Sequence, residues 1–161
     1  HMKSRRKGPS WVITKLVDLQ DAVGGIAITD NGDIYYSLRK SSSSIWKFTE
    51  DNTTPSKIVL EASTRGDDYC GRGIVWNQHR NSIYVCAVGG IFEYNTHTGK
   101  VTKVVDGTEE TLRDGSFQNA SVRWPWGITV DKEGNLLITD QYYIRKIDFT
   151  KETIETIADC V

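Results

Sequence analysis

A unit of related sequence occurs three times along the chain, and this repeat constrains the fold more than any other feature. Each copy opens with Gly-Ile, alternates apolar with polar residues, turns through polar residues and continues into a second apolar stretch. The three copies are Gly25–Ser37, Gly73–Cys86 and Gly127–Thr139. Their first glycines lie 48 residues (73 − 25) and 54 residues (127 − 73) apart. A chain with such a period is expected to stack similar structural units side by side.

Each copy is followed by two further segments with the composition of β-strands. The first of these is Ile45–Phe48, Ile91–Tyr94 or Ile144–Ile147, and the second is Lys57–Leu60, Lys100–Val105 or Thr153–Ile157. Polar connections such as Glu50–Pro55 and Asn95–Gly99 separate them. No segment shows a sustained apolar period of 3.6 residues, which argues against helices. The sequence therefore predicts an all-β fold of three four-stranded antiparallel modules, arranged as the blades of a β-propeller.

The strand pattern also divides the chain. We expect residues 1–10 to be a tag scar and a basic tail, and the modules to span about 24–61, 72–105 and 126–158. Residues 11–17 resemble the last strand of a module but belong to none, so they predict a spare outer strand. Three blades cannot close a ring and would leave apolar faces exposed. We therefore expect either a longer protein or a second copy that completes a six-bladed ring.

The third module resembles a known repeat. It reads Asp114-Gly115, then Ala120-Ser-Val-Arg-Trp-Pro-Trp-Gly-Ile128, then a hairpin ending in Asp140, then Ile144-Arg-Lys-Ile147. This order is similar to the NHL repeat, in which a DG turn precedes A-x-F-x-x-P-x-G-I, a hairpin ending in Asp, and an (I/V)-R-K-(I/V) strand. The first two modules match weakly, with Ser37 and Ala87 near the expected Asp, and Val122 replaces an aromatic residue in the third.

The resemblance carries expectations about function. It implies a toroid of typically six blades that serves as a platform for binding proteins or other ligands. Some NHL proteins bind RNA, and some propellers of similar construction are lactonases or amidating lyases. These three classes of function are the alternatives that the sequence must distinguish.

Charge and composition favour no single class of partner. The formal net charge is −1, which gives no general support for binding nucleic acid or an anionic membrane. The three cysteines form no CxxC pair, which argues against a structural zinc site, and leave a Cys70–Cys86 bridge open. Their odd number favours an intracellular protein, whereas the sequons at Asn52 and Asn119 keep an extracellular one open.

One edge of the blades is expected to carry the binding site, because loops held by a sheet scaffold usually do so. The loops that enter the inner strands and those between the second and third strands should share this edge, with His79 and His97 on the opposite one. The predicted binding residues are the tyrosines and arginines of these loops, which are types common in interface hot spots: Tyr69, Arg72, Arg113, Arg123, Tyr142 and Tyr143. We expect Trp126, next to Pro125, to pack in the core.

The interpretation that follows is a non-enzymatic platform for a protein partner, with no cofactor, no catalytic residue and no metal ligand identified. The first alternative is a propeller hydrolase or lyase that depends on a divalent metal; loop carboxylates such as Asp67, Asp68 and Asp114 could ligate one. The second is an RNA-binding NHL module, which we consider less favoured because the loop edge is mixed in charge.

Overall fold

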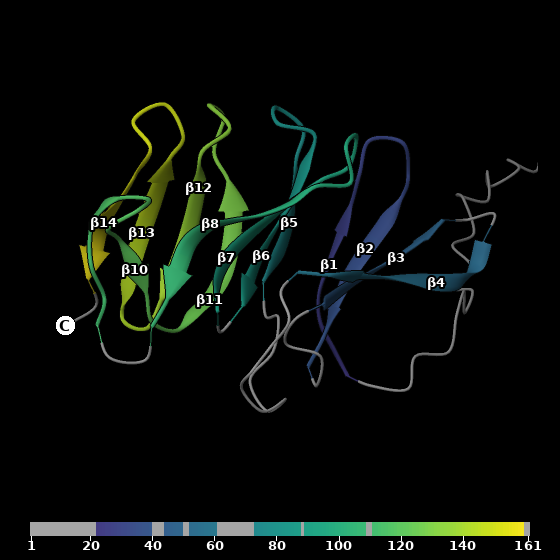
Figure 1. Ribbon diagram of the computed structural model, residues 1–161, viewed down its shortest axis with the longest axis horizontal. Helices are drawn as coiled ribbons and strands as arrows, with labels where there is room; N and C mark the ends of the chain where they lie inside the picture. The colour runs from purple at the N-terminus through teal and green to yellow at the C-terminus, as the bar shows by residue number, and fades with distance from the viewer. Residues whose placement is uncertain are drawn as a thin grey trace, which may run out of the picture.

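The computed structural model describes residues 22–39, 44–49, 52–60, 73–87, 89–108 and 111–159, and these form strands, turns and loops. They fold into three sheets that stand side by side, each built around four antiparallel strands, with the inner strands of neighbouring sheets in contact (Figure 1). The expected all-β fold of three propeller blades is therefore confirmed. The spare strand predicted at residues 11–17 lies outside the described residues. None of the described residues forms a helix that is long and apolar enough to cross a membrane.

Each blade runs from its inner to its outer strand in chain order. Blade 1 consists of β1 (Val23–Ile28), β2 (Ile34–Leu38), β3 (Ser44–Thr49) and β4 (Asn52–Val59). Blade 2 consists of β5 (Ile74–Asn77), β6 (Ser82–Ala87), β7 (Gly90–Asn95) and β8 (Val101–Gly107). Blade 3 consists of β11 (Pro125–Val130), β12 (Leu136–Asp140), β13 (Tyr143–Asp148) and β14 (Thr153–Asp159).

Two short strands join blades 2 and 3, and the sequence did not predict them. β9 (Gly115–Ser116) pairs antiparallel with β14 of blade 3, and β10 (Ser121–Val122) pairs parallel with β8 of blade 2. No strand was expected between the second module, which ends at about residue 105, and the third, which begins at about residue 126. Because β9 and β10 follow one another in the chain, this connection holds the outer edges of two blades together.

Strand β4 begins earlier than expected. Residues 50–55 were predicted as a polar connection, but the structure places Asn52 to Pro55 within β4, where Asn52 pairs with Thr49. Pro55 is compatible with this strand because β4 is the outer strand among the described residues of its sheet. A proline there removes no hydrogen bond to a further strand.

Two apolar layers fill the spaces between the blades. One lies between blades 1 and 2 and includes Tyr35, Ile45, Ile74 and Phe92. The other lies between blades 2 and 3 and includes Tyr84, Ile91, Leu136 and Ile154. In blade 2, which lies between the two layers, alternate residues of a strand enter opposite layers, so the alternation seen in its sequence reflects a sheet buried on both faces.

Glycine is required where the inner strands approach most closely. A Cβ on Gly73 would lie 2.6 Å from the carbonyl oxygen of Trp126 and 2.9 Å from Cγ2 of Ile128. The first residue of the Gly-Ile motif in blade 2 is therefore set by its contact with the inner strand of blade 3. Gly32 and Gly134 have positive φ angles of 87° and 84°, as the predicted hairpin turns need.

Candidate binding surface

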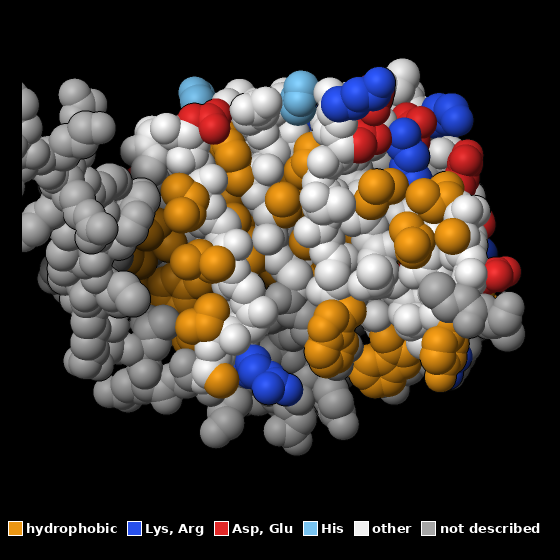
Figure 2. Space-filling view, turned by 180° about the vertical axis from the view of Figure 1, so that it is seen from behind, with side chains coloured by type: hydrophobic (Ala, Val, Ile, Leu, Met, Phe, Trp, Pro, Cys, Tyr) orange, Lys and Arg blue, Asp and Glu red, His pale blue; other side chains and the backbone are white. Residues whose placement is uncertain are grey.

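The loops and the tight hairpins occupy opposite edges of the molecule. In Figure 1 the β1–β2, β11–β12 and β13–β14 hairpins lie along the upper edge, whereas the β12–β13 turn lies along the lower edge. Figure 2 shows histidine side chains at the hairpin edge and large hydrophobic side chains at the loop edge. This agrees with the expected division of the two edges.

A buried carboxylate fixes the loop edge of blade 3. Asp140 is fully buried at the end of β12, and its Oδ1 accepts hydrogen bonds from the backbone N–H of Arg123 at 3.1 Å and of Trp124 at 2.7 Å. Gln141, with a positive φ of 59°, donates its N–H to the carbonyl oxygen of Trp124 at 3.3 Å. The segment that enters β11 and the turn that follows β12 are therefore held against each other.

This arrangement brings together three of the predicted binding residues. Arg123 and Tyr143 are partly buried, and Tyr142 is 62% exposed. Trp126 follows in the same segment and is 55% exposed. We call Arg123, Trp126, Tyr142 and Tyr143 the loop-face patch. Its aromatic side chains belong to segments whose backbone is held in place by the hydrogen bonds to Asp140.

Arg145 is the centre of the network beneath this patch. The side chain is fully buried, and its Nη1 donates to Asp140 Oδ2 at 2.9 Å and to the carbonyl oxygen of Ser121 at 2.8 Å. Its Nη2 donates to Asp114 Oδ1 and to the carbonyl oxygen of Arg113, both at 2.8 Å. One guanidinium thus ties β13 to the β12–β13 turn and to both ends of the β9–β10 connection.

Asp114 completes the network from the partly exposed side. Desolvation by burial acts to raise its pKa, but hydrogen bonds from the backbone and hydroxyl of Thr156 and from Arg145 outweigh this. The pKa of Asp114 is therefore held below its usual range. The Asp and Arg of the NHL-like motif act here as structural groups, and the sequence did not reveal this role.

Blades 1 and 2 replace this network with apolar groups. Strand register places Ala87 and Phe92 of blade 2 where blade 3 has Asp140 and Arg145. In blade 1 the same positions hold Leu38 and Trp46, so Leu38, rather than the expected Ser37, stands at the Asp position. A lysine lies over each ring, with Nζ of Lys103 at 5.5 Å from the centroid of Phe92 and Lys57 at 5.9 Å from that of Trp46.

The remaining predicted residues are less central. Arg113 is exposed, and its Nη1 donates to the carbonyl oxygen of Asn119 at 3.4 Å. The carbonyl oxygen of Arg113 accepts a hydrogen bond from Arg145, so Arg113 belongs to the network of Arg145 and not to the loop-face patch.

The predicted binding residues Tyr69 and Arg72 lie outside the described residues. Cys70, which could form a disulfide with Cys86, also lies outside them. Cys86 itself is fully buried between blades 2 and 3.

The expectation that Trp126 packs in the core was wrong. The pairing of β11 with β12 shifts between Pro125 and Ile128, so that two residues of β11 face one residue of β12. Such a bulge changes the direction in which a side chain points. Pro125 is buried and Trp126 is directed toward solvent.

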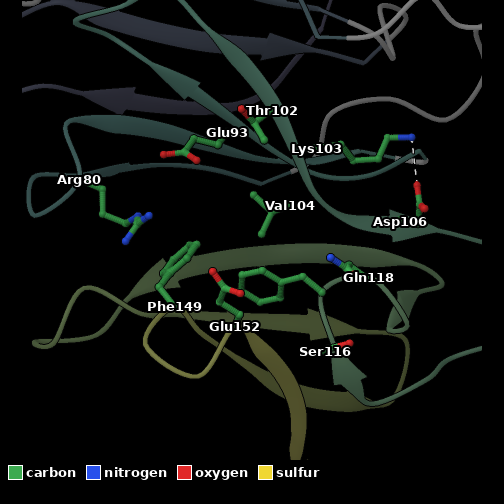
Figure 3. A pocket seen from close by; sticks show the side chains of 11 residues that line it. Arg80, Glu93, Thr102, Lys103, Val104, Asp106, Ser116, Gln118, Phe149 and Glu152 are labelled. Carbon is green, nitrogen blue, oxygen red and sulfur yellow. Dashed lines mark ion pairs between the residues drawn. The ribbon is translucent and has the colours of Figure 1, made fainter.

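A second concave surface, which the sequence did not predict, lies between the outer strands of blades 2 and 3. This groove has a volume of about 690 Å³, and Figure 3 shows Arg80 and Phe149 at one end and the Lys103–Asp106 ion pair at the other. Arg80 lies over the ring of Phe149, with Cζ 4.1 Å from its centroid, and donates from Nε to the Tyr84 hydroxyl at 2.9 Å.

Glu93 in this groove is the acceptor of a small hydrogen-bonded network. Burial, followed by the neighbouring Glu93 carboxylate, raises the pKa of Tyr84, so its phenol stays protonated. That phenol donates to Glu93 at 2.9 Å, and Ser82 donates to the same carboxylate oxygen at 2.7 Å.

Across the part of the chain that the structure describes, no group of three or more His, Cys, Asp or Glu residues could hold a metal ion.

The stacked four-stranded blades define a protein of the β-propeller type. No protein-family profile matches the chain. Among curated proteins it is similar to Protein SUPPRESSOR OF QUENCHING 1, chloroplastic, of Arabidopsis thaliana, with 33% identity over 61 residues. The match covers 36% of this chain and 6% of that protein, so the chain spans a small part of its relative.

Solved structures support the same class. A protein of unknown function from Bacteroides thetaiotaomicron superposes with a TM-score of 0.73 and 22% identity, over 92% of this chain and 39% of its own. An auxiliary nutrient binding protein from the same organism superposes with a TM-score of 0.67 and 17% identity, over 91% of this chain and 38% of its own. A streptogramin B lyase superposes with a TM-score of 0.63 and 21% identity, over 86% of this chain and 41% of its own. The chain spans about two fifths of each of these three proteins, and the likeness shows the propeller fold.

Proposed function

We propose that this chain is an NHL-like propeller segment that binds a protein partner through the loop-face patch. The observation that carries the proposal is the exposure of Tyr142 and Trp126 on backbone that is fixed by the buried Asp140. Aromatic residues and arginine contribute most of the energy at protein interfaces. A surface that is ordered before binding loses less conformational entropy when the partner arrives.

The NHL assignment rests on the third blade. Asp114, Asp140 and Arg145 are three of the charged residues of the motif, and they meet in one hydrogen-bonded network. These polar residues of the motif therefore stabilise this blade through their contacts with one another. The apolar residues at the matching positions of blades 1 and 2 account for their weak resemblance.

A lyase or a metal-dependent hydrolase is the second candidate, and the similarity to a streptogramin B lyase favours it. Two observations favour binding instead. The histidines of the described residues lie on the hairpin edge, away from the patch, and those residues hold no cluster of metal ligands. RNA binding is a third candidate, for which Arg113 and Arg123 beside the aromatic patch would be the contacts.

A capture experiment tests the proposal. The purified chain is cross-linked in a native extract alongside a Tyr142→Ala/Arg123→Ala variant and a Thr98→Ala/Lys132→Ala control on the hairpin edge. We expect the loop-edge variant to lose a specific protein by tenfold or more, which corresponds to about 1.4 kcal/mol, and the control to keep it. Equal capture by all three proteins would contradict the proposal.

The same samples separate the alternatives. Capture that nuclease treatment abolishes and that falls steeply with salt would favour RNA. Calorimetric binding of Mg²⁺ or Mn²⁺ that persists in the loop-edge variant would favour the metal-dependent enzyme. Circular dichroism of each variant checks that the blades remain folded.

A propeller platform also needs a closed ring. We propose that the ring is completed either by further blades of a longer protein or by a second copy of this chain; a mass of twice 18.1 kDa in sedimentation equilibrium would favour the second copy. This proposal concerns the blade faces rather than the loop edge, and it can fail independently of the partner site.

A further inference from the structure

A further hollow lies at the hairpin edge, between blades 1 and 2, on the opposite edge from the loop-face patch. Its volume is about 500 Å³, and three turns form its rim: β1–β2, β5–β6 and β7–β8. In Figure 1 these turns stand close together along the upper edge of the molecule. Lys47 of β3 and Trp76 of β5 complete the lining. A hollow of this size falls within the usual range for small-ligand sites.

The blade 1 side of this rim is held in place by its own hydrogen bonds. The side chain of Asn31 accepts from the Thr29 hydroxyl and from the backbone N–H of Asp33, the latter at 3.4 Å. Oδ2 of Asp33 binds Nζ of Lys47 at 2.7 Å, and its carbonyl oxygen accepts the backbone N–H of Thr29 at 3.0 Å. The turn is therefore ordered before a ligand arrives, which lowers the entropic cost of binding.

The blade 2 side consists of two turns that are tied together. The backbone N–H and the hydroxyl of Thr96 both donate to the carbonyl oxygen of Asn81, at 3.0 Å and 2.9 Å. The backbone N–H of His97 donates to Oδ1 of Asn95 at 3.1 Å. The side chains of Asn81 and His97 thus project from backbone that is fixed by these contacts.

Three exposed side chains of the rim have hydrogen-bonding capacity to offer. Asp30, Asn81 and His97 form no side-chain hydrogen bond or ion pair with any other residue that the structure describes. Their groups differ, since a carboxylate accepts, an amide both donates and accepts, and an imidazole can do either. A ligand that satisfies all three must itself carry several groups that donate and accept, as hydroxyl groups do.

The charges around the hollow favour a neutral ligand. Lys47 and Asp33 neutralise each other through their ion pair. The carboxylate of Asp30 repels an anion, and one exposed carboxylate attracts a cation only weakly. Within the described ranges, no group of three or more His, Cys, Asp or Glu side chains could hold a metal ion. An uncharged molecule with several hydroxyl groups therefore matches this rim best.

Trp76 gives the hollow an aromatic wall. Its side chain is partly exposed and packs against the apolar layer between blades 1 and 2. A sugar ring has a face of C–H groups, which packs favourably on the negative π face of an indole ring. The groove between blades 2 and 3 differs on this point, because the guanidinium of Arg80 already lies over its Phe149 ring.

We propose that the hollow at the hairpin edge binds a neutral carbohydrate. The hydroxyl groups of the sugar hydrogen-bond to Asp30, Asn81 and His97, and its apolar face packs against Trp76. This second site lies on the other edge of the blades from the loop-face patch, and it does not depend on the protein partner proposed above.

Nuclear magnetic resonance of the full, isotope-labelled chain tests the proposal. The probes are D-glucose, D-galactose, D-mannose and N-acetyl-D-glucosamine, each titrated separately into the wild type. At least one of them should cause saturable shifts in the backbone amide signals of the three turns and of Trp76. The signals of the loop-face patch should stay where they are.

Substitutions at the rim should weaken binding of the responding sugar about tenfold each, which corresponds to about 1.4 kcal/mol. Asp30→Ala and His97→Ala remove exposed side chains, so the blades should stay folded. Asn81→Gly removes the amide and keeps the φ angle of 50°, which glycine adopts readily. Lys132→Ala, at an exposed position on the same edge of blade 3, is the control and should bind the sugar as the wild type does.

Three results would overturn the proposal. The first is that none of the four sugars causes a saturable shift at the rim. The second is sugar binding that all three rim variants retain in full. The third is tighter binding of inorganic phosphate or Mg²⁺ at the rim than of any sugar. If circular dichroism shows that a variant is unfolded, the shifts of the wild type and the remaining variants decide. Loss of partner capture with retained sugar binding would leave this proposal standing, and the reverse result would leave the loop-face proposal standing.

Discussion

Nη1 of Arg145 donates to Oδ2 of Asp140 across 2.9 Å, and both side chains are completely removed from solvent. This ion pair lies directly beneath the loop-face patch, since the same aspartate accepts the backbone N–H groups of Arg123 and Trp124. It therefore links the stability of blade 3 to the shape of the proposed binding surface.

The first prediction concerns this pair. Asp140→Ala should leave the Arg145 guanidinium buried without its main counter-charge and lower the free energy of unfolding by about 3–5 kcal/mol. Blade 2 shows an apolar solution at the same positions, Ala87 with Phe92. The double variant Asp140→Ala/Arg145→Phe should thus lose less stability than Asp140→Ala alone, because Nε of Arg145, which has no partner among the described residues, is removed too.

Urea unfolding of the two variants and the wild type measures this difference. A double variant that loses as much stability as Asp140→Ala alone would contradict it. Partner capture by the double variant provides a second readout, since loss of the backbone anchor should weaken the loop-face patch even where the blade stays folded.

The second prediction concerns pH. The pKa of Asp114 is lower in the folded state than in the unfolded state, so its carboxylate stabilises the fold above the unfolded value of about 3.9. This contribution is lost as the pH falls through the lower folded value. Asp114→Asn should therefore be less stable than the wild type at neutral pH, and the difference should be smaller at a pH below the unfolded value.

Unfolding by urea at both pH values measures the effect. Thr156→Val is the matched variant, because it removes the hydroxyl that donates to Asp114 at 3.0 Å and leaves the backbone donor in place. It should reduce the pH dependence only in part. An Asp114→Asn variant whose deficit is the same at both pH values would argue against the carboxylate as its cause.

The repeat predicted the blades well because strand alternation and hairpin turns are local properties. Gly32 and Gly134 mark turns through their positive φ angles alone, and the Gly-Ile segments became inner strands as expected. The two-residue strands β9 and β10 could not be predicted, because they exist only through pairing with β14 and β8.

The candidate site was harder to predict for the same reason. The sequence placed Arg123 and Tyr142 on one edge, but it could not show that Asp140 joins their segments, or that a bulge directs Trp126 outward. The role of Arg145 depends on groups from residues 113, 114, 121 and 140 that meet only in the folded chain. The sequence feature that could have indicated this role is the position of Arg145, a charged residue within an otherwise apolar strand segment.

The third prediction concerns the contact between inner strands. Gly73→Ala should destabilise the fold by about 1–3 kcal/mol, the usual cost of overpacking, because the new Cβ would lie 2.6 Å from the carbonyl oxygen of Trp126. Gly99→Ala is the comparison: its Cβ would meet nothing within 4 Å, but its φ is 70°, so it should cost about 1–2 kcal/mol through backbone conformation alone. Partner capture separates the two, since only Gly73→Ala moves the segment that carries Trp126.

The fourth prediction separates binding from folding. Tyr142 is largely exposed on the turn after β12, so Tyr142→Ala should change the free energy of unfolding by less than about 0.5 kcal/mol. The same substitution should weaken partner capture, because an exposed aromatic side chain on a fixed backbone supplies contact area at low entropic cost. Thermal and urea unfolding are measured beside capture, with Thr98→Ala as the exposed control. A Tyr142→Ala variant that unfolds much more easily would show that the side chain supports the blade, and the loop-face patch would then lose its principal contact residue.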